Sequence, residues 1–203
     1  PYTSDIQAFG AAPSAEHFLG TDDTGRDVFA RLIYGGRVSL LVGLLSAIIS
    51  LCIGVPLGLL AGYYKGIWET IVMRAADIFM SFPSMILILV LVSLIGPSVW
   101  TVTLVIGVLG WTDFAKLIYG NVLSVREKEY VESAKAVGTK DLAILIKYII
   151  PNAFAPILIN FTFRTAQAII QESALSFLGM GVQPPQASWG NILYAAQSIT
   201  VLS

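Results

Sequence analysis

One uncharged run constrains this chain more than any other feature. It covers the 27 residues from Val38 to Tyr64, between Arg37 and Lys65. As an α-helix the run is about 40 Å long, which exceeds the roughly 30 Å hydrocarbon core of a bilayer. Helices buried in soluble proteins rarely extend so far without a charge. The run therefore predicts a membrane-spanning helix over about residues 38–64.

The composition supports a membrane protein and excludes several other classes. Of the 203 residues, 56% are hydrophobic and only 12% are charged, against about 25% charged in soluble domains. This composition excludes a disordered chain and a water-soluble globule. A net charge of -1 disfavours a nucleic-acid-binding protein. With one cysteine, Cys52, and one histidine, His17, we expect no disulfide framework and no metal site.

Further apolar segments predict additional spans. Asp77 and Asp113 bracket a second uncharged run that is too long for one helix and is interrupted by Gly96-Pro97-Ser98. A later apolar segment follows Pro151. We expect spans over about 78–95, 100–123 and 152–175, the last two with charged residues inside them.

The distribution of basic residues predicts the orientation. Eight of the twelve Lys and Arg residues lie in segments 63–77 and 113–151, and basic residues gather on the cytoplasmic side. We therefore expect segment 125–151 in the cytoplasm, and an outer segment 1–37 and an outer loop 176–191 on the other side. The chain begins without Met and stops within the apolar stretch 192–203, so we expect a fragment of a longer protein, with all 203 residues in one transmembrane domain.

The cytoplasmic segment 125–151 has its own internal pattern. It predicts two short helices joined at Gly138, the first over about 128–137. The second is expected to end before Pro151, because a residue that precedes proline avoids the α conformation. Such a helix serves either as a rigid knob for a soluble partner or as an amphipathic helix on the bilayer surface. The periodicity alone leaves both interpretations open.

Polar residues inside the fourth predicted span form a second candidate site. Charges within a bilayer are costly and usually mark a pathway or an ion pair. Helical spacing places the polar residues of this span on one broad face. Either this face lines a wet translocation path, or Glu172 merely ends the span and Arg164 bonds a neighbouring helix. Asp113 and Lys116 are expected to pair with each other. The path candidates are Asn160, Arg164, Gln167, Gln171 and Glu172.

Three stretches of the chain resemble a known family. The first stretch begins with Glu132-Ser133-Ala134, continues with Gly138 after three residues and ends with Tyr148-Ile149-Ile150-Pro151 after nine more. This pattern resembles the "EAA" loop of permease subunits of bacterial ABC importers. The chain departs from that pattern at Ser133, Tyr148 and Ile150. Stretches 17–28 and 174–190 are similar to the C-type permease of dipeptide, oligopeptide and nickel importers, so the resemblance covers essentially the whole chain.

The resemblance implies an all-α polytopic transmembrane bundle with a short cytoplasmic coupling helix, in a bacterial-type plasma (inner) membrane. It implies six spans, of which four are seen here. It also implies a heterodimer with a second permease, two ATP-binding subunits that carry ATP and Mg, and an external substrate-binding protein. The residues that would couple to the ATPases are Glu132, Ser133, Ala134, Gly138 and Pro151.

The chain itself carries no recognisable catalytic motif. It contains no glycine-rich phosphate loop followed by Lys-Ser/Thr, and no Ser/His/Asp or Cys/His set. We therefore expect no enzymatic activity and no cofactor on this chain. The resemblance implies a transport subunit in an importer of short peptides. An importer of nickel or metal chelates is the alternative within the family. An ion-coupled secondary transporter that uses Arg164 and Glu172 is the alternative from another class.

Overall fold

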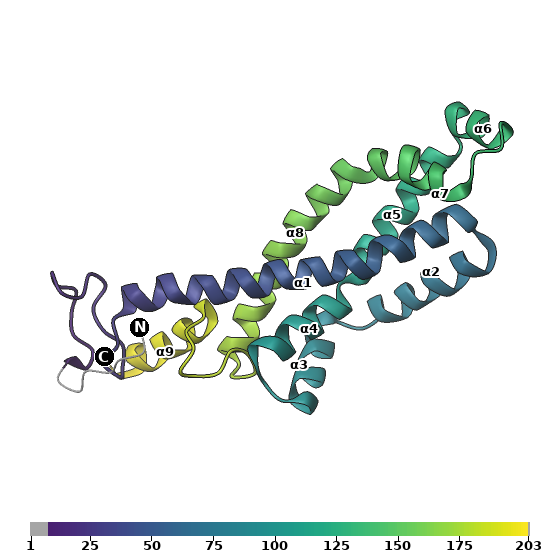
Figure 1. The fold of residues 1–203 in the computed structure, drawn as a ribbon. Helices are drawn as coiled ribbons and strands as arrows, with labels where there is room; N and C mark the ends of the chain where they lie inside the picture. The colour runs from purple at the N-terminus through teal and green to yellow at the C-terminus, as the bar shows by residue number, and fades with distance from the viewer. Residues whose placement is uncertain (1–7, 203) are drawn as a thin grey trace. The chain divides into compact units, whose positions relative to one another are not determined.

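A computed structural model describes residues 8–202, with side chains described as far as residue 197. The described residues form helices and no strand; one isolated bridge joins Thr21 and Asp27. The predicted all-α class is confirmed. The helices, labelled in Figure 1, are α1 (Val28–Tyr64), α2 (Gly66–Met80), α3 (Ser84–Ile95), α4 (Val99–Leu109), α5 (Trp111–Arg126), α6 (Glu129–Ala136), α7 (Asp141–Ile144), the π-helical turn η2 (Leu145–Ile149), α8 (Ile150–Phe177) and α9 (Trp189–Leu202).

Three helical runs are long and apolar enough to cross a membrane: 28–64, 99–126 and 141–177. The pair α2 and α3 makes a fourth if it is counted as one broken span. The helix predicted over 38–64 begins ten residues earlier, at Val28, because the Asp27 carboxylate accepts the Ala30 N–H at 2.7 Å and starts the helix there. The segment predicted over 78–95 is broken at residues 81–83, before α3 begins at Ser84.

The contacts divide the chain into two compact units. One unit contains the residues up to 45, 87–106 and those from 165 on, and the other contains 46–86 and 107–164. Residues 1–7 of the predicted outer segment lie outside the described residues. Four helices, α1, α3, α4 and α8, contribute residues to both units. The sites below are therefore described within the unit that contains them.

In the second unit, α1 packs closely on α5 through three glycines spaced four residues apart. A Cβ atom at Gly58 would lie 2.6 Å from the backbone oxygen of Ala115, and one at Gly62 would lie 2.7 Å from the Cβ of Val122. Gly54 approaches the backbone of Trp111 in the same way. Small residues at this spacing allow two membrane helices to touch along their backbones.

Replacing Gly58 tests this packing. Gly58→Ala should lower the free energy of unfolding by about 1–3 kcal/mol, because the new Cβ meets a backbone atom that cannot move aside. Gly120→Ala is the matched control, since a Cβ at Gly120 on α5 would meet nothing within 4 Å. Thermal unfolding of the two purified variants in detergent measures both effects. Equal midpoints for the two variants would contradict the close approach.

In the first unit, a buried carboxylate organises the segment before α1. Asp22 accepts hydrogen bonds from the N–H groups of Thr24 and Arg26, both at 2.9 Å, and from the Arg26 Nε, also at 2.9 Å. Burial alone would raise the pKa of Asp22, but a hydrogen bond from the Thr24 hydroxyl at 2.7 Å, together with these bonds, outweighs it and holds the pKa below the ordinary value. The Nε of Arg31 lies 3.5 Å from the same carboxylate. The segment is therefore tied to the first turns of α1.

Candidate functional site

The predicted cytoplasmic helix is α6, which begins at Glu129 and ends at Ala136. Glu129 and Glu132 lie in its first turn and Lys135 in its last, which suits the helix dipole. Gly138 follows at the predicted junction with φ +82°, a left-handed conformation that suits glycine. The Gly138 N–H donates to the Lys135 oxygen at 2.9 Å, and the Thr139 N–H donates to the Ala134 oxygen at 3.0 Å. These two bonds form a Schellman motif, which fixes the corner between α6 and α7.

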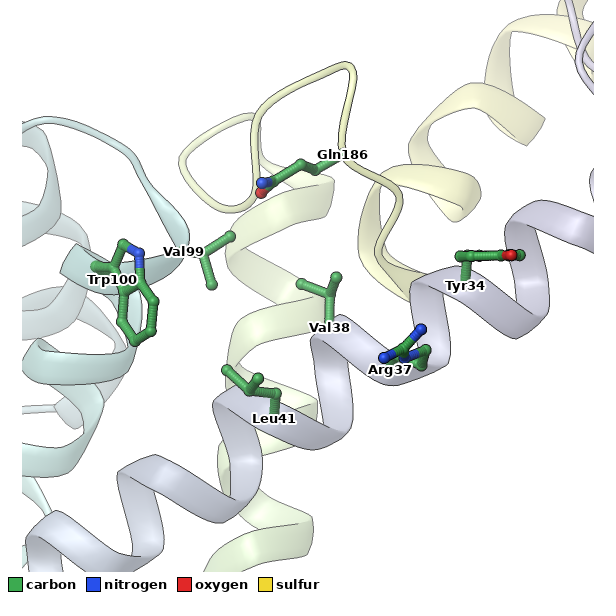
Figure 2. A pocket seen from close by; sticks show the side chains of 7 residues that line it. All are labelled: Tyr34, Arg37, Val38, Leu41, Val99, Trp100 and Gln186. Carbon is green, nitrogen blue, oxygen red and sulfur yellow. The ribbon is translucent and has the colours of Figure 1, made fainter. Parts of the chain in front are cut away.

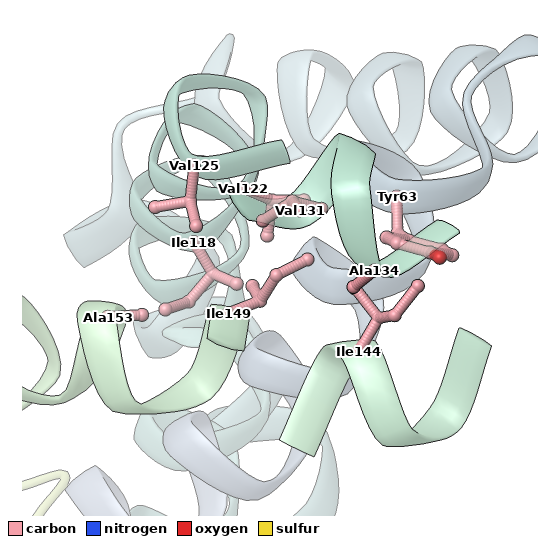
Figure 3. Close-up of a cluster of buried hydrophobic side chains, with 9 residues drawn as sticks. All are labelled: Tyr63, Ile118, Val122, Val125, Val131, Ala134, Ile144, Ile149 and Ala153. Carbon is pink, nitrogen blue, oxygen red and sulfur yellow. The ribbon is translucent and has the colours of Figure 1, made fainter. Parts of the chain in front are cut away.

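The inner face of α6 is anchored in a hydrophobic cluster (Figure 3). Val131 and Ala134 are buried there. Their neighbours come from α1, α5, α7, η2 and α8, so the cluster joins five segments to α6. The other members are Tyr63, Ile118, Val122, Val125, Ile144, Ile149 and Ala153. The outer face is free, because Glu132 and Ser133 are exposed, and Val137 at the end of the helix is 81% exposed.

Polar contacts fix the same corner to the end of α1. The Tyr63 hydroxyl donates to the Asp141 carboxylate at 2.6 Å, and the Lys135 Nζ lies 5.1 Å from the centre of the Tyr63 ring. Arg126, the last residue of α5, donates to the backbone oxygens of Tyr63 at 2.8 Å and Gly62 at 3.2 Å. None of these residues was among the site residues predicted from the sequence. A basic residue at the end of a predicted span, as at Arg126, was the available signal.

Pro151 does not end a helix, so that prediction is wrong. The helical path runs from α7 through η2 into α8, which contains Pro151 in its first turn. In η2 the hydrogen bonds reach five residues back, and the Ile150 N–H donates to the Leu145 oxygen. A proline in an early helix position needs no N–H donor of its own, and the wider π turn before it accommodates the ring. Pro151 is exposed.

The five polar residues predicted for a translocation path all lie on α8 but differ in burial. Arg164, Gln171 and Glu172 are buried, Asn160 is half-buried and Gln167 is exposed. Buried polar groups require partners within the protein. The structure gives Arg164 and Glu172 such partners, and the two are in different units.

Arg164 lies against the break between α4 and α5. Its Nη1 is 3.6 Å from the Asp113 carboxylate. The helix is interrupted at Gly110, where a Cβ would collide with the Arg164 guanidinium and with the Ser50 hydroxyl. That hydroxyl donates to the oxygen of Gly107 at 2.8 Å. The absence of a side chain at Gly110 therefore makes the space that the guanidinium occupies.

The predicted pair between Asp113 and Lys116 is wrong. Lys116 instead binds Asp77 of α2, with 2.8 Å between its Nζ and the carboxylate. The two residues are close in sequence, but each faces a different helix: Asp113 faces α8 and Lys116 faces α2. Tertiary packing therefore overrides the local spacing.

Glu172 is fully buried, so the alternative in which it merely ends a span at the surface is wrong. Its carboxylate accepts hydrogen bonds from the Ser39 hydroxyl of α1 at 2.8 Å and from the Ser176 hydroxyl at 2.7 Å. The Ser176 oxygen also accepts the Val182 N–H at 2.9 Å. Glu172 thus joins α1, the end of α8 and the connection to α9.

The described residues offer little for a metal ion. Between residues 8 and 202 no group of three His, Cys, Asp or Glu side chains lies close enough to bind one. His17, the one histidine of the chain, has its Nδ1 2.8 Å from the carboxylate of Asp27. The polar residues described above anchor helices to one another through buried contacts.

A double-mutant cycle tests the fit between Gly110 and Arg164. Gly110→Ala should cost about 1–3 kcal/mol of stability, because the guanidinium must leave its place beside Asp113. In an Arg164→Ala background the same change should cost less, because the guanidinium is gone and only the Ser50 hydroxyl still collides with the new Cβ. Thermal unfolding in detergent of the wild type, both single variants and the double variant measures the coupling. Additive effects would show that the two residues do not share this space.

The known proteins that are similar to this chain are membrane components of transport systems. The family model for the inner membrane component of binding-protein-dependent transport systems matches residues 54–203. A glutathione transport system permease protein, GsiD, from Pectobacterium atrosepticum is 38% identical over 199 residues, which are 98% of this chain and 66% of that protein. A putative peptide permease protein from Brucella suis is 41% identical over 203 residues, which are 100% of this chain and 67% of that protein.

The dipeptide transport system permease protein DppC from Bacillus subtilis is 42% identical over 178 residues, which are 88% of this chain and 56% of that protein. The chain thus spans about two thirds or less of the length of these relatives. Among solved structures, the MetNI methionine ABC transporter in an inward-facing conformation matches with a TM-score of 0.71 at 19% identity, over 86% of this chain and 83% of that chain. This structural likeness concerns the fold.

Proposed function

Because the chain belongs to the family of inner membrane components of binding-protein-dependent transport systems, we propose that it is a permease subunit of an ATP-driven importer for short peptides. The names of its relatives support a peptide substrate over nickel or metal chelates, since they concern glutathione, peptides and dipeptides. Neither the family nor these relatives support an ion-coupled secondary transporter. The proposed location is the inner membrane, with residues 125–151 in the cytoplasm.

One observation carries this proposal: α6 is buried on one face and free on the other. The buried face contacts the ends of α1, α5 and α8 through the hydrophobic cluster and through Tyr63. The free face presents Glu132 and Ser133. A soluble subunit that grips the free face would therefore move three long helices together. This arrangement suits a rigid knob better than a helix that rests on lipid, whose apolar face would be turned to the bilayer.

The family to which the chain belongs supports the proposed assembly. Two ATP-binding subunits would bind ATP and Mg and hydrolyse the nucleotide, and one of them would hold α6. A second permease would form the other half of the translocation path, and an external binding protein would deliver the peptide. The role of this chain is mechanical: Glu132, Ser133 and Ala134 shape the docking helix, and Gly138 sets its corner. Pro151 lies where the corner continues into α8.

Gly138→Val tests the corner. A β-branched residue resists φ +82°, so the assembled transporter should keep its basal ATPase activity but lose about tenfold or more of its peptide-driven uptake. A Cβ at this position would meet nothing within 4 Å, so the effect is conformational rather than steric. Gly138→Asn is the matched control, because asparagine tolerates the left-handed conformation. Normal uptake in the valine variant would overturn the proposed coupling geometry.

Arg164→Ala tests the proposed translocation path. If the polar residues of α8 serve transport, the change should reduce peptide uptake several-fold while the ATP-binding subunits still co-purify with the permease. Arg74→Ala is the control, because Arg74 is an exposed arginine of α2 whose charge lies 3.8 Å from Asp77. Uptake by Arg164→Ala equal to that of the control would contradict a role in the path.

A further inference from the structure

The first unit contains a pocket of about 340 Å³ whose lining residues have no role in the proposed transport function (Figure 2). One wall comes from α1, a second from the start of α4 and a third from the connection between α8 and α9. Its lining includes one cation, Arg37, two aromatic residues, Tyr34 and Trp100, and the amide of Gln186. It includes no acidic residue.

The pocket lies at the start of the predicted span of α1, where the helix is expected to enter the hydrocarbon region. Arg37 is the last charged residue before the uncharged run that ends at Tyr64. Tyrosine and tryptophan gather at the same level of membrane proteins, where lipid headgroups meet the acyl chains. Trp100 is 65% exposed, which suits a side chain that contacts lipid. Polar groups and apolar residues thus meet at the predicted outer interface.

The positive charge of Arg37 favours an anionic ligand in this pocket. Within residues 8–197, whose side chains are described, no carboxylate forms an ion pair with Arg37. The guanidinium is a hydrogen-bond donor of the kind that phosphate oxygens accept. A zwitterionic peptide would leave its ammonium group without an acidic partner here. The apolar side chains of Val38 and Leu41 continue the lining and suit an acyl chain.

We propose that this pocket binds a phospholipid of the outer leaflet, with the phosphate on Arg37 and one acyl chain along Leu41. The site has one positive charge, which matches the single negative charge of a phosphodiester. A volume of about 340 Å³ holds the headgroup region and leaves the chains to follow the surface of α1. The lipid would fix the start of α4 and the α8–α9 connection to α1.

The test uses the complete purified transporter and native mass spectrometry with added phosphatidylglycerol. Arg37→Gln should weaken retention of the lipid about tenfold, because it removes a charge-assisted hydrogen bond. Arg37→Lys should retain most of the binding. Leu41→Ala should weaken retention about three- to fivefold, whereas Leu40→Ala should not, since Leu40 is similarly exposed but does not line the pocket.

Two further probes separate a lipid from a soluble phosphate. A diacylglycerol with the same chains should bind more weakly than phosphatidylglycerol, because it lacks the phosphate. Soluble glycerol phosphate at equal concentration should not displace the lipid, because it lacks the chains. Equal retention by the wild type and Arg37→Gln, or full displacement by glycerol phosphate, would overturn the proposal. Lipid retention is measured without transport, so the result is independent of the proposed import function.

Discussion

The close approach of α1 to α5 is the contact on which the rest of the second unit depends. Glycines at positions 54, 58 and 62 let the two helices meet at backbone distance, and this approach brings Arg126 of α5 to the last carbonyls of α1. Tyr63 then lies where it contacts both Lys135 and Asp141. A larger side chain in the glycine series would separate the helices and shift the base on which α6 rests.

Buried polar residues serve each unit in a different way. In the second unit, Arg164 occupies the space left by Gly110 and faces Asp113, so a helix break and a buried cation require each other. In the first unit, Glu172 takes two hydroxyl donors and joins three segments. Intramembrane ionisable groups usually mark functional positions. Here they also maintain the packing around them.

The sequence predicted those features that depend on local chemistry. The uncharged run after Arg37, the corner at Gly138 and the helix at Glu129–Ala136 follow from hydropathy and from the conformational freedom of glycine. Features that depend on distant partners were not predictable. Nothing near Lys116 in the sequence indicates Asp77, and nothing near Tyr63 indicates Asp141. Burial of Asp22 beside Arg31, which belongs to the first turns of α1, likewise appears only in three dimensions.

The π-helical turn at Leu145–Ile149 has a consequence for everything that follows it along α8. A π turn takes up about one residue more than an α turn, and each residue of an α-helix advances the chain by about 100° around the axis. The side chains after the turn are therefore out of phase, by about that angle, with those of an uninterrupted helix. Arg164, whose guanidinium lies beside Asp113, belongs to this segment after the turn. A change of backbone winding more than a dozen residues upstream thus contributes to the direction in which this buried cation leaves its helix.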